Sequence, residues 1–369
     1  MVQVKKSNKK IEETEPEIQV QPIDKSNFSI ATFASKLIGK YGAGIVTHKS
    51  VGLIHPVDVI PTGSLKLDRA VGIGGLPRGR VVEVFGQESG GKTTLVLGAI
   101  AQAQKHGGNA AFIDAENALD LSMARGIGVD TDNLLVAQPD YGEQGLEITE
   151  DLVATGCFEI VAIDSVAALV PRAELEGDYD DANMGLQARM IGKGLRRISK
   201  VVSKTNTCVV FINQLRQKLG LVFGSNEVTP GGNALKFWSS LRLDVRKISS
   251  IKSGENVIGN KVKITVIKNK LAPPFKVVET DLIFGKGFSY ESELFDMALE
   301  AGIVEKSGSW FSCGGERLGL GKAASLETIL KSENMKNTII EKIERLSHEK
   351  KEEENGTDQD KETVQSDVL

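Results

Sequence analysis

Four short apolar runs, rich in β-branched residues, constrain the fold of this 369-residue chain most strongly. They are VVEVF (81–85), AAFIDA (110–115), EIVAIDSV (159–166) and TCVVFIN (207–213). Strands that are apolar on both faces are typical of a parallel sheet covered by helices on both sides. Helical patterns such as TTLVLGAIAQAQK and GEQGLEITEDLVATG separate the runs. The resulting βαβ series predicts an α/β fold with a doubly wound, mainly parallel sheet.

Segments outside this series predict three additions. The segments RLDVRKIS (242–249) and KVKITVIKN (261–269) alternate apolar and polar residues, and we expect them as antiparallel strands at one edge of the sheet. The stretch 290–346 combines short helical patterns with a glycine-rich interruption, which predicts a small, separate α+β domain. Residues 28–40 predict a helix ahead of the main body, and its apolar face must pack on something.

Charge and cysteine content limit the class of protein. The net charge is −4, but residues 347–369 hold eight acidic and three basic residues, which leaves the rest of the chain near +1. This polar tail and the charged arm 1–25 predict disorder. The chain has three cysteines without a CxxC pair, which fits a reducing cytosol. No apolar run approaches the ~20 residues of a membrane-spanning helix, so we expect no membrane partner and a cytoplasmic location.

The stretch GQESGGKTT directly follows the first apolar run and matches G-x-x-x-x-G-K-[ST] through Gly86, Gly91, Lys92 and Thr93. Glycines leave the backbone N–H groups free to converge on phosphate oxygens, and the helix that begins here adds its positive end. Lys92 is expected to reach the β- and γ-phosphates and the Thr93 hydroxyl to ligate Mg²⁺. The sequence therefore predicts a nucleotide-binding phosphate loop.

Carboxylates at the ends of two further apolar runs complete this prediction. Asp164 closes EIVAID and is expected to hold the metal through water. Glu116 follows the strand AAFIDA and could activate the attacking water as a general base. Asp114 lies two residues earlier on the same face, so spacing alone leaves both carboxylates open. The combination predicts hydrolysis of ATP with Mg²⁺.

Several longer blocks, in order along residues 28–330, resemble the bacterial RecA recombinase family. They are FIDAENALD, QPDYGEQGLEI, IDSVAALVPRAELEG, MGLQARM, FINQLRQKLG and TPGGNALKFW. The resemblance implies an ATP-dependent filament that forms on single-stranded DNA, pairs it with homologous duplex DNA and exchanges strands in recombinational repair and the SOS response. It also implies five segments: a disordered arm (1–25), an N-terminal oligomerisation segment (26–53), an ATPase and DNA-binding core (54–289), a C-terminal domain (290–346) and a disordered acidic tail (347–369).

The resemblance assigns roles to individual residues. Gln214 is expected to sense the γ-phosphate, and Lys268 and Lys270 are expected to reach across the filament interface to the neighbour's ATP. Phe237 is expected to couple the interface to ATP. The implied phosphate contacts are Gly86, Gln87, Glu88, Ser89, Gly90, Gly91, Lys92, Thr93 and Thr94, and the implied adenine contacts are Asp120, Met123 and Phe284.

Two polar, glycine-rich segments, 176–185 and 215–232, align with the DNA-binding loops of the family. Backbone amides and cations there can hold phosphates without reading bases, which suits a protein that accepts any sequence. Leu219 and Phe223 are expected either to wedge between bases or to pack inside a closed loop. The expected DNA-binding residues are Met184, Arg189, Arg196, Arg216, Lys218, Leu219, Phe223, Gly231, Gly232 and Asn233.

Departures from the family pattern predict a divergent member and leave a cellular or a phage origin open. Met123 stands where a tyrosine usually stacks on adenine, and a thioether can still cover a purine face. Asp178, Asp180 and Asp181 make the first DNA loop more acidic. A LexA-like repressor and loader proteins are further candidate partners. Two other functions stay open: a ring-type ATPase or helicase, and an ATP-binding DNA coat protein without strand exchange.

Overall fold

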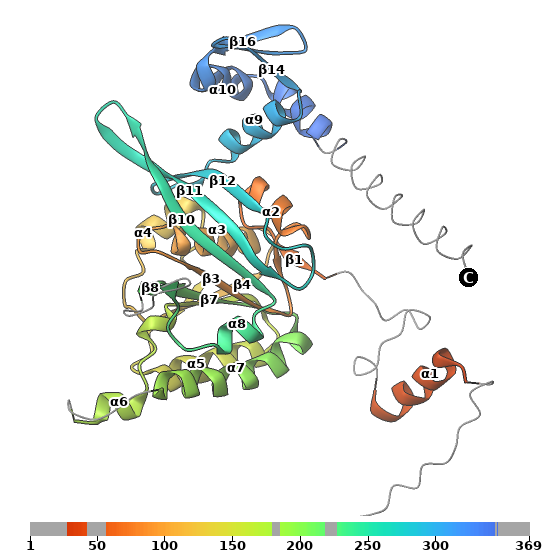
Figure 1. The fold of residues 1–369 in the computed structure, drawn as a ribbon, viewed down its shortest axis with the longest axis vertical. Helices are drawn as coiled ribbons and strands as arrows, with labels where there is room; N and C mark the ends of the chain where they lie inside the picture. Colours follow the sequence, from red (N-terminus) through yellow and green to blue (C-terminus); the bar gives the residue numbers. More distant parts are fainter. Residues whose placement is uncertain (1–27, 43–56, 179–184, 218–226, 344, 346–369) are drawn as a thin grey trace, which may run out of the picture. The chain divides into compact units, whose positions relative to one another are not determined.

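A computed structural model of the chain describes residues 28–42, 57–178, 185–217, 227–343 and 345. Residue contacts divide the chain into two units, 1–56 and 57–369. The second unit is built around a nine-stranded sheet (Figure 1). Its strands are β3 (Val81–Gly86), β4 (Asn109–Asp114), β5 (Leu134–Ala137), β6 (Phe158–Asp164), β7 (Cys208–Gln214), β10 (Leu241–Ser253), β11 (Asn256–Asn269), β12 (Val277–Ile283) and β13 (Gly287–Phe288).

The strand order is β13-β12-β11-β10-β3-β7-β6-β4-β5. In this order, the last six strands, which begin with β10, are parallel to one another. Helices cover both faces of this sheet (Figure 1). The helices of the second unit up to the sheet's last strand are α2 (Leu65–Val71), α3 (Lys92–Lys105), α4 (Leu121–Ile127), α5 (Gly142–Ala154), α6 (Arg172–Glu176), α7 (Leu186–Thr205) and α8 (Ala234–Trp238), with a 3₁₀ turn, η3 (Val166–Ala168). The predicted doubly wound α/β fold is confirmed.

The central strands are buried on both faces, which explains their nearly continuous apolar sequences. On β7, Cys208 and Val210 belong to the core shared with α2, α3 and α4. Val209 and Phe211, which alternate with them, belong to the core shared with α5, α7 and α8. Successive side chains of a strand point to opposite faces, so both sets of helices require an apolar partner.

One strand direction differs from the prediction. The segment 242–249 was expected as an antiparallel edge strand. Instead, β10 pairs parallel with β3 on one side and antiparallel with β11 on the other, and β11, β12 and β13 are the antiparallel additions. A parallel neighbour requires a crossover connection. The chain makes this crossover between β7 and β10, where α8 packs its buried Leu235 into the core below the sheet.

Two small sheets accompany the core. The first joins β1 (Val59–Ile60) to β2 (Leu76–Pro77). The second joins β8 (Arg216–Gln217) to β9 (Glu227–Val228), the two ends of the second predicted DNA loop. This loop was expected to carry little structure, and its described ends instead form a short antiparallel ladder.

The C-terminal part has a core of its own, as an α+β arrangement requires. It contains α9 (Tyr290–Glu300), α10 (Gly321–Lys331), a helical stretch at 333–343 and a three-stranded sheet, β14 (Val304–Ser307), β15 (Trp310–Cys313) and β16 (Glu316–Leu320). Phe295 and Phe311 meet edge to face in this core, with ring centroids 5.1 Å apart. The small C-terminal α+β domain is thereby confirmed, and its exact limits stay a prediction.

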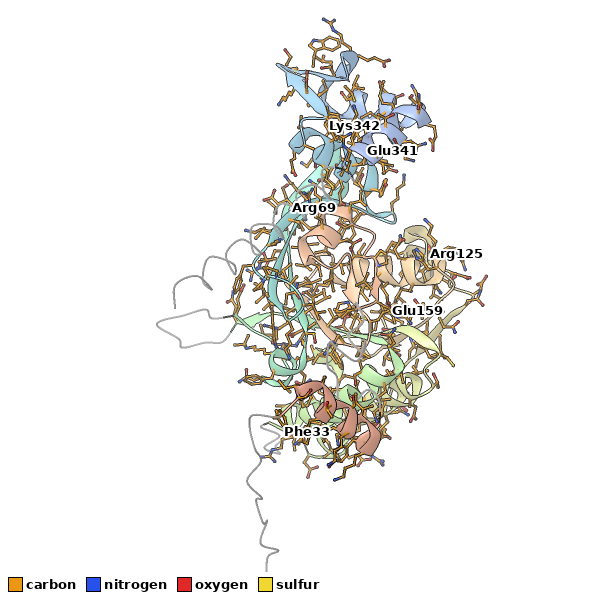
Figure 2. All side chains as sticks on the ribbon, turned by 90° about the vertical axis from the view of Figure 1, so that its right-hand side faces the viewer. Phe33, Arg69, Arg125, Glu159, Glu341 and Lys342 are labelled. Carbon is orange, nitrogen blue, oxygen red and sulfur yellow. The ribbon has the colours of Figure 1, made fainter. Side chains whose placement is uncertain are left out.

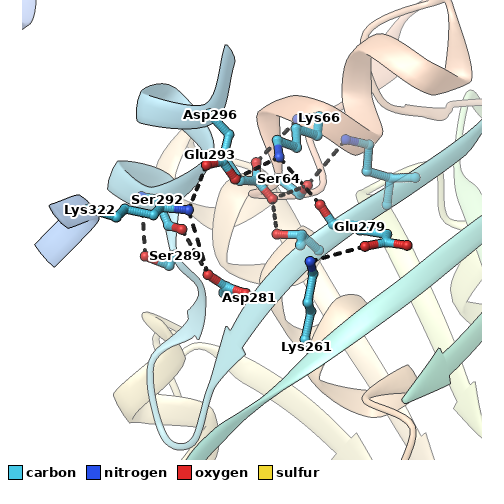
Figure 3. A network of polar contacts seen from close by, with 12 residues as sticks. Ser64, Lys66, Lys261, Glu279, Asp281, Ser289, Ser292, Glu293, Asp296 and Lys322 are labelled. Atoms are coloured by element: carbon cyan, nitrogen blue, oxygen red, sulfur yellow. Dashed lines mark hydrogen bonds and ion pairs between the residues drawn. The ribbon is translucent and has the colours of Figure 1, made fainter. Parts of the chain in front are cut away.

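A buried carboxylate joins this part to α2 (Figure 3). Glu293 of α9 accepts hydrogen bonds from the Ser64 hydroxyl (2.6 Å) and from the backbone N–H of Lys66 (3.1 Å), at the N-terminus of α2. The Lys66 ammonium pairs with Asp296 at 2.8 Å, and Lys322 of α10 pairs with the same carboxylate at 2.6 Å. The junction is therefore polar and fully paired where its groups are buried.

The first unit contains α1 (Ile30–Tyr41), capped by Ser29, whose hydroxyl accepts from the N–H of Thr32 at 3.4 Å. Within this helix, Ala34 is buried, whereas Tyr41 and Phe33, labelled in Figure 2, are exposed. The predicted helix is present, with bounds shifted by one or two residues. In the described part of the chain, no helix combines the length and the apolar character needed to cross a membrane.

Candidate active site

The phosphate loop connects β3 to α3 and requires glycine for reasons of space. A Cβ on Gly86 would lie 2.0 Å from the carbonyl oxygen of Val245 on β10, and a Cβ on Gly90 would lie 3.0 Å from the same oxygen. Gly91 has a φ of +96° and precedes the first turn of α3. The close approach of the loop to β10 therefore excludes side chains, and the backbone N–H groups at the start of α3 remain available to an anion.

Lys92 lies across this loop. Its Nζ donates to the carbonyl oxygen of Gln87 at 2.7 Å, and the residue is buried. Burial lowers the pKa of Lys92, an effect opposed by the nearby carboxylates of Asp164, Glu116 and Glu88. Among the described residues, the direct partner of this ammonium is thus a neutral carbonyl oxygen, which an anionic oxygen can replace.

The carboxyl end of β6 supplies the second group. The Thr93 hydroxyl donates to Oδ2 of Asp164 at 2.6 Å. Burial raises the pKa of Asp164 to about 6, with the Thr93 hydrogen bond acting in the opposite direction. A hydroxyl and a carboxylate are oxygen ligands of the kind that Mg²⁺ prefers, so the pair fits that ion. Among the described residues, no cluster of three or more histidine, cysteine or acidic side chains could hold a metal by itself.

The two carboxylates that the sequence left open have different surroundings. Asp114 is 2% exposed and accepts hydrogen bonds from the N–H groups of Ala118 (3.1 Å) and Leu119 (3.2 Å) and from Gln138 Nε2 (3.1 Å). The Asp114 carboxylate therefore stabilises the turn after β4. Glu116 is exposed, and the donors that its carboxylate meets among the described residues are side chains rather than backbone N–H groups.

Glu116 is instead held by two polar side chains from neighbouring strand ends. Its Oε1 accepts from Gln214 Nε2 at 2.9 Å and from the Ser165 hydroxyl. Gln214 ends β7 directly opposite Gly86, so the glutamine lies beside the phosphate loop. Ser165 was not predicted, although it follows Asp164 directly in the sequence. The structure thus brings Lys92, Thr93, Asp164, Glu116 and Gln214 to one edge of the sheet.

The residues expected near adenine lie on α4 and on the turn after β12. Asp120 caps α4 and accepts from the N–H groups of Ser122 (2.8 Å) and Met123 (3.0 Å). A Cβ on Gly126 would lie 2.3 Å from the carbonyl oxygen of Gly285, so α4 closely approaches the turn that carries Phe284. Phe284 is 52% exposed, and a flat apolar face is therefore available there.

The described residues of the predicted DNA-binding set lie on α7 and on both sides of the second loop. Arg189, Arg196 and Arg216 are exposed. The loop returns to the core through Gly231 and Gly232, where a Cβ would lie 2.9 Å from Val166 and 2.9 Å from Ala188, respectively. Asn233, which follows, is exposed. Four predicted residues lie outside the described part of the chain: Met184, Lys218, Leu219 and Phe223.

The expected interface residues lie away from this edge. Lys268 donates from Nζ to the carbonyl oxygens of Lys236 (2.6 Å) and Phe237 (3.1 Å), at the end of α8. Phe237 is 72% exposed. The N–H of Lys270 donates to the carbonyl oxygen of Ser240. The N–H of Ser240 in turn donates to the carbonyl oxygen of Val81, the first residue of β3. The phosphate loop follows the last residue of β3, about 16 Å away at ~3.3 Å per residue.

The similarity of this chain to known proteins covers nearly all of the described residues. The sequence model of the RecA N-terminal domain matches residues 29–289, and that of the RecA C-terminal domain matches residues 292–347. Protein RecA of Syntrophus aciditrophicus is 61% identical over 269 residues, which are 73% of this chain and 78% of the relative. Protein RecA of Geobacter sulfurreducens is 53% identical over 310 residues, or 84% and 92% of the two chains. The chain therefore belongs to the RecA family of recombinases, which are DNA-dependent ATPases.

Proposed function

We propose that this chain assembles with ATP into a filament on single-stranded DNA, pairs that strand with homologous duplex DNA and exchanges the strands. One observation carries the proposal: Glu116 is held by Gln214, at the base of the second loop, within the group that also contains Thr93 and Asp164. The proposed water-activating group thus contacts the chain segment that leads into the DNA loop. ATP hydrolysis and DNA binding then share one structural element.

The phosphate loop binds the ATP phosphates through its backbone N–H groups, and Lys92 exchanges the Gln87 carbonyl oxygen for phosphate oxygens. Thr93 and Asp164 would hold Mg²⁺, Asp164 through water, and the bound ion would supply positive charge to the ATP phosphates. Their hydroxyl and carboxylate oxygens, 2.6 Å apart, support this assignment. Asp120, Met123 and Phe284 hold the adenine, with the thioether and the aromatic ring covering its faces.

Glu116 acts as the general base and takes a proton from the attacking water. Its exposure supports this role over Asp114, whose oxygens accept from the backbone. Gln214 leaves Glu116 when a γ-phosphate accepts its amide N–H, and it returns after hydrolysis. The backbone after Gln214 then has two positions, one for each partner of the amide.

Lys268 and Lys270 act on the ATP of a neighbouring subunit. The backbone of Lys270 is level with Val81 at the start of β3, with Ser240 between them, and the Lys268 side chain is bonded to the end of α8. Both positions lie away from the phosphate loop, which supports action in trans. Two cations on the developing phosphate charge would make hydrolysis depend on assembly. The exposed side chains of Phe237 and of α1 support a head-to-tail contact, which grows into an open helix rather than a closed dimer.

The single strand binds along the loop that β8 and β9 close and along the start of α7. The exposed guanidinium groups of Arg189, Arg196 and Arg216 neutralise phosphates without regard to sequence. Met184, Lys218, Leu219, Phe223, Gly231, Gly232 and Asn233 complete this surface. We also propose a cytoplasmic location, in line with three free cysteines, and a LexA-like repressor and loader proteins as partners.

The test is ATP hydrolysis with and without single-stranded DNA, together with exchange between a circular single strand and a linear duplex. Hydrolysis that rises with DNA, and exchange that requires ATP, are the expected results. Glu116→Gln should abolish the DNA-stimulated hydrolysis, while Glu147→Gln, an exposed position on α5, should not. Equal hydrolysis without DNA would favour a ring-type ATPase. DNA binding without exchange would favour a coat protein.

A further inference from the structure

A fully buried polar network crosses the middle of the sheet on three adjacent strands, β7, β3 and β10. Its centre is Glu83, which is 0% exposed. Oε2 of Glu83 accepts from Arg242 Nε at 2.5 Å, and Oε1 accepts from Asn213 Nδ2 at 3.1 Å. Arg242 is 8% exposed and Asn213 is 0% exposed, so water does not replace any of these contacts.

The asparagine end of this network touches both functional segments. Asn213 Nδ2 also donates to the carbonyl oxygen of Pro230, at the end of the second loop, at 3.2 Å. Asn213 Oδ1 accepts from the backbone N–H of Gln214 at 3.0 Å. A single amide group therefore fixes the position of the DNA loop's last residues relative to the γ-phosphate sensor.

The arginine end leads to the interface residues. Arg242 stacks on Phe85 with its guanidinium carbon 4.5 Å from the ring centroid, and it is the pairing partner of Lys268 between β10 and β11. Lys268 in turn holds the end of α8 at Phe237. Burial lowers the pKa of Lys268, the cations of Lys270 and Arg242 lower it further, and Glu83 opposes them. The Glu83 carboxylate thus pairs with Arg242 directly and acts electrostatically on Lys268.

Stability alone does not account for a buried ion pair in this position. Replacement of such a pair by well-packed apolar residues is often neutral or stabilising, because desolvation offsets the attraction. Removal of one partner is costly, because the other charge stays buried without compensation. This network is distinguished by what it connects. Hydrogen bonds link Pro230 to Arg242 through Asn213 and Glu83, and strand pairing links Arg242 to Lys268. The network therefore extends from the proposed DNA loop to the proposed interface.

We propose that Glu83 is a positioning residue that couples DNA binding to ATP hydrolysis. It touches neither nucleotide nor DNA, and it acts through Asn213 on Gln214 and through Arg242 on Lys268. Movement of the loop at Pro230 then shifts the Asn213 amide, and the sensor and the interface lysine respond together. The inference rests on the proposed function, because it assumes that the loop from 215 to 232 binds DNA.

The test uses the full-length protein and the isosteric variant Glu83→Gln. Hydrolysis is measured without DNA and over a titration with single-stranded DNA, and DNA binding is measured separately by fluorescence anisotropy with a non-hydrolysable ATP analogue. We expect hydrolysis without DNA to change by less than about twofold and the DNA-stimulated kcat to fall by about tenfold, a typical coupling between sites. The half-saturating DNA concentration should stay within about twofold of the parent value.

The matched control is Glu159→Gln. Glu159 (Figure 2) also pairs with an arginine, Arg78, at 3.3 Å, but it stands near the start of β6, whereas Asp164 ends that strand. This variant should keep the full DNA stimulation. Asn213→Ala is expected to lose stimulation as Glu83→Gln does, and the double variant should lose no more than either single one. Additive losses would overturn a shared network.

A purely structural role for the network would give a different result. If Glu83→Gln only lowers the midpoint of thermal unfolding and keeps the DNA stimulation, the network is structural and the proposal is wrong. If Glu83→Gln fails to fold, Arg242→Lys, which keeps the charge and loses the guanidinium stack, takes its place with the same readouts. If the ATP hydrolysis rate of the parent protein does not rise with single-stranded DNA, the result contradicts the proposed function itself.

Discussion

At the scale of single residues, two carboxylates that differ by two positions have different roles: Asp114 ends β4, and Glu116 lies in the turn that follows it. Asp114 accepts three hydrogen bonds and is buried, whereas Glu116 meets Gln214 and Ser165 at the surface. We expect Asp114→Ala to lower the free energy of unfolding by about 2–3 kcal/mol, because it leaves buried donors unpaired. Glu116→Ala should change stability by less than about 0.5 kcal/mol and abolish hydrolysis. Urea unfolding and ATPase assays of the two variants test this contrast.

Asp68 gives a second prediction at this scale, on pH. It accepts from the N–H (2.9 Å) and the hydroxyl (2.8 Å) of Thr62, and burial raises its pKa to about 7. The folded state therefore binds this proton more tightly than the unfolded state. Its contribution to stability is fully present below pH ~4 and is lost as the pH rises through about 7.

Asp68→Asn keeps the shape and removes the titration. The variant should exceed the parent in free energy of unfolding by about 2 kcal/mol at pH 8, and this advantage should shrink toward pH 4.5. Urea unfolding at both pH values measures the difference. An advantage that does not depend on pH would show that the charge of Asp68 is not the cause.

The sequence predicts the position of a residue well where that residue directly follows an apolar run. The phosphate loop, Asp164 and Gln214 each stand at the end of an apolar run, so their common edge follows from the parallel sheet alone. Ser165, Gln138 and Asn213 were not predicted, because their roles depend on which side chains they meet across strands. A sequence pattern specifies burial and direction, and it does not specify hydrogen-bond partners.

At the scale of elements, the contact between the phosphate loop and β10 is the tightest in the site. A Cβ on Gly86 would lie 2.0 Å from Val245, so Gly86→Ala must displace one strand from the other. We expect this variant to lose nucleotide binding, measured with a fluorescent ATP analogue. Gly107→Ala is the control: its φ is +83° with no atom within 4 Å, so it should cost about 1 kcal/mol of stability and keep binding.

The strand in this contact, β10, was predicted as a strand but with the wrong direction relative to β3. The apolar pattern of β10 indicated a strand and did not indicate its direction. That direction is set by the crossover through α8, a helix of five residues that is too short to show a periodic pattern. The strands buried on both faces were predicted correctly, because their composition depends only on that burial.

At the scale of the whole molecule, the proposed water-activating residue Glu116 and the proposed interface residue Lys270 lie toward opposite ends of the central strands. We therefore expect subunits with different defects to complement one another. Glu116→Gln and the double variant Lys268→Ala/Lys270→Ala should each be inactive alone. An equal mixture should recover about a quarter of the parent ATPase rate, since a random neighbour pair has the working combination about one time in four. A mixture without activity would mean that the lysines act within their own subunit.

Lys270 bonds Ser240, level with the start of β3 and far from the phosphate loop, so each proposed hydrolysis site needs groups from two subunits. In a filament whose sites are each shared by two neighbours, a row of n subunits contains n − 1 complete sites, and one end always carries an incomplete one. Turnover per subunit then rises with filament length as (n − 1)/n. Short filaments are poor enzymes for purely geometric reasons, and severing one long filament inactivates one site at every cut.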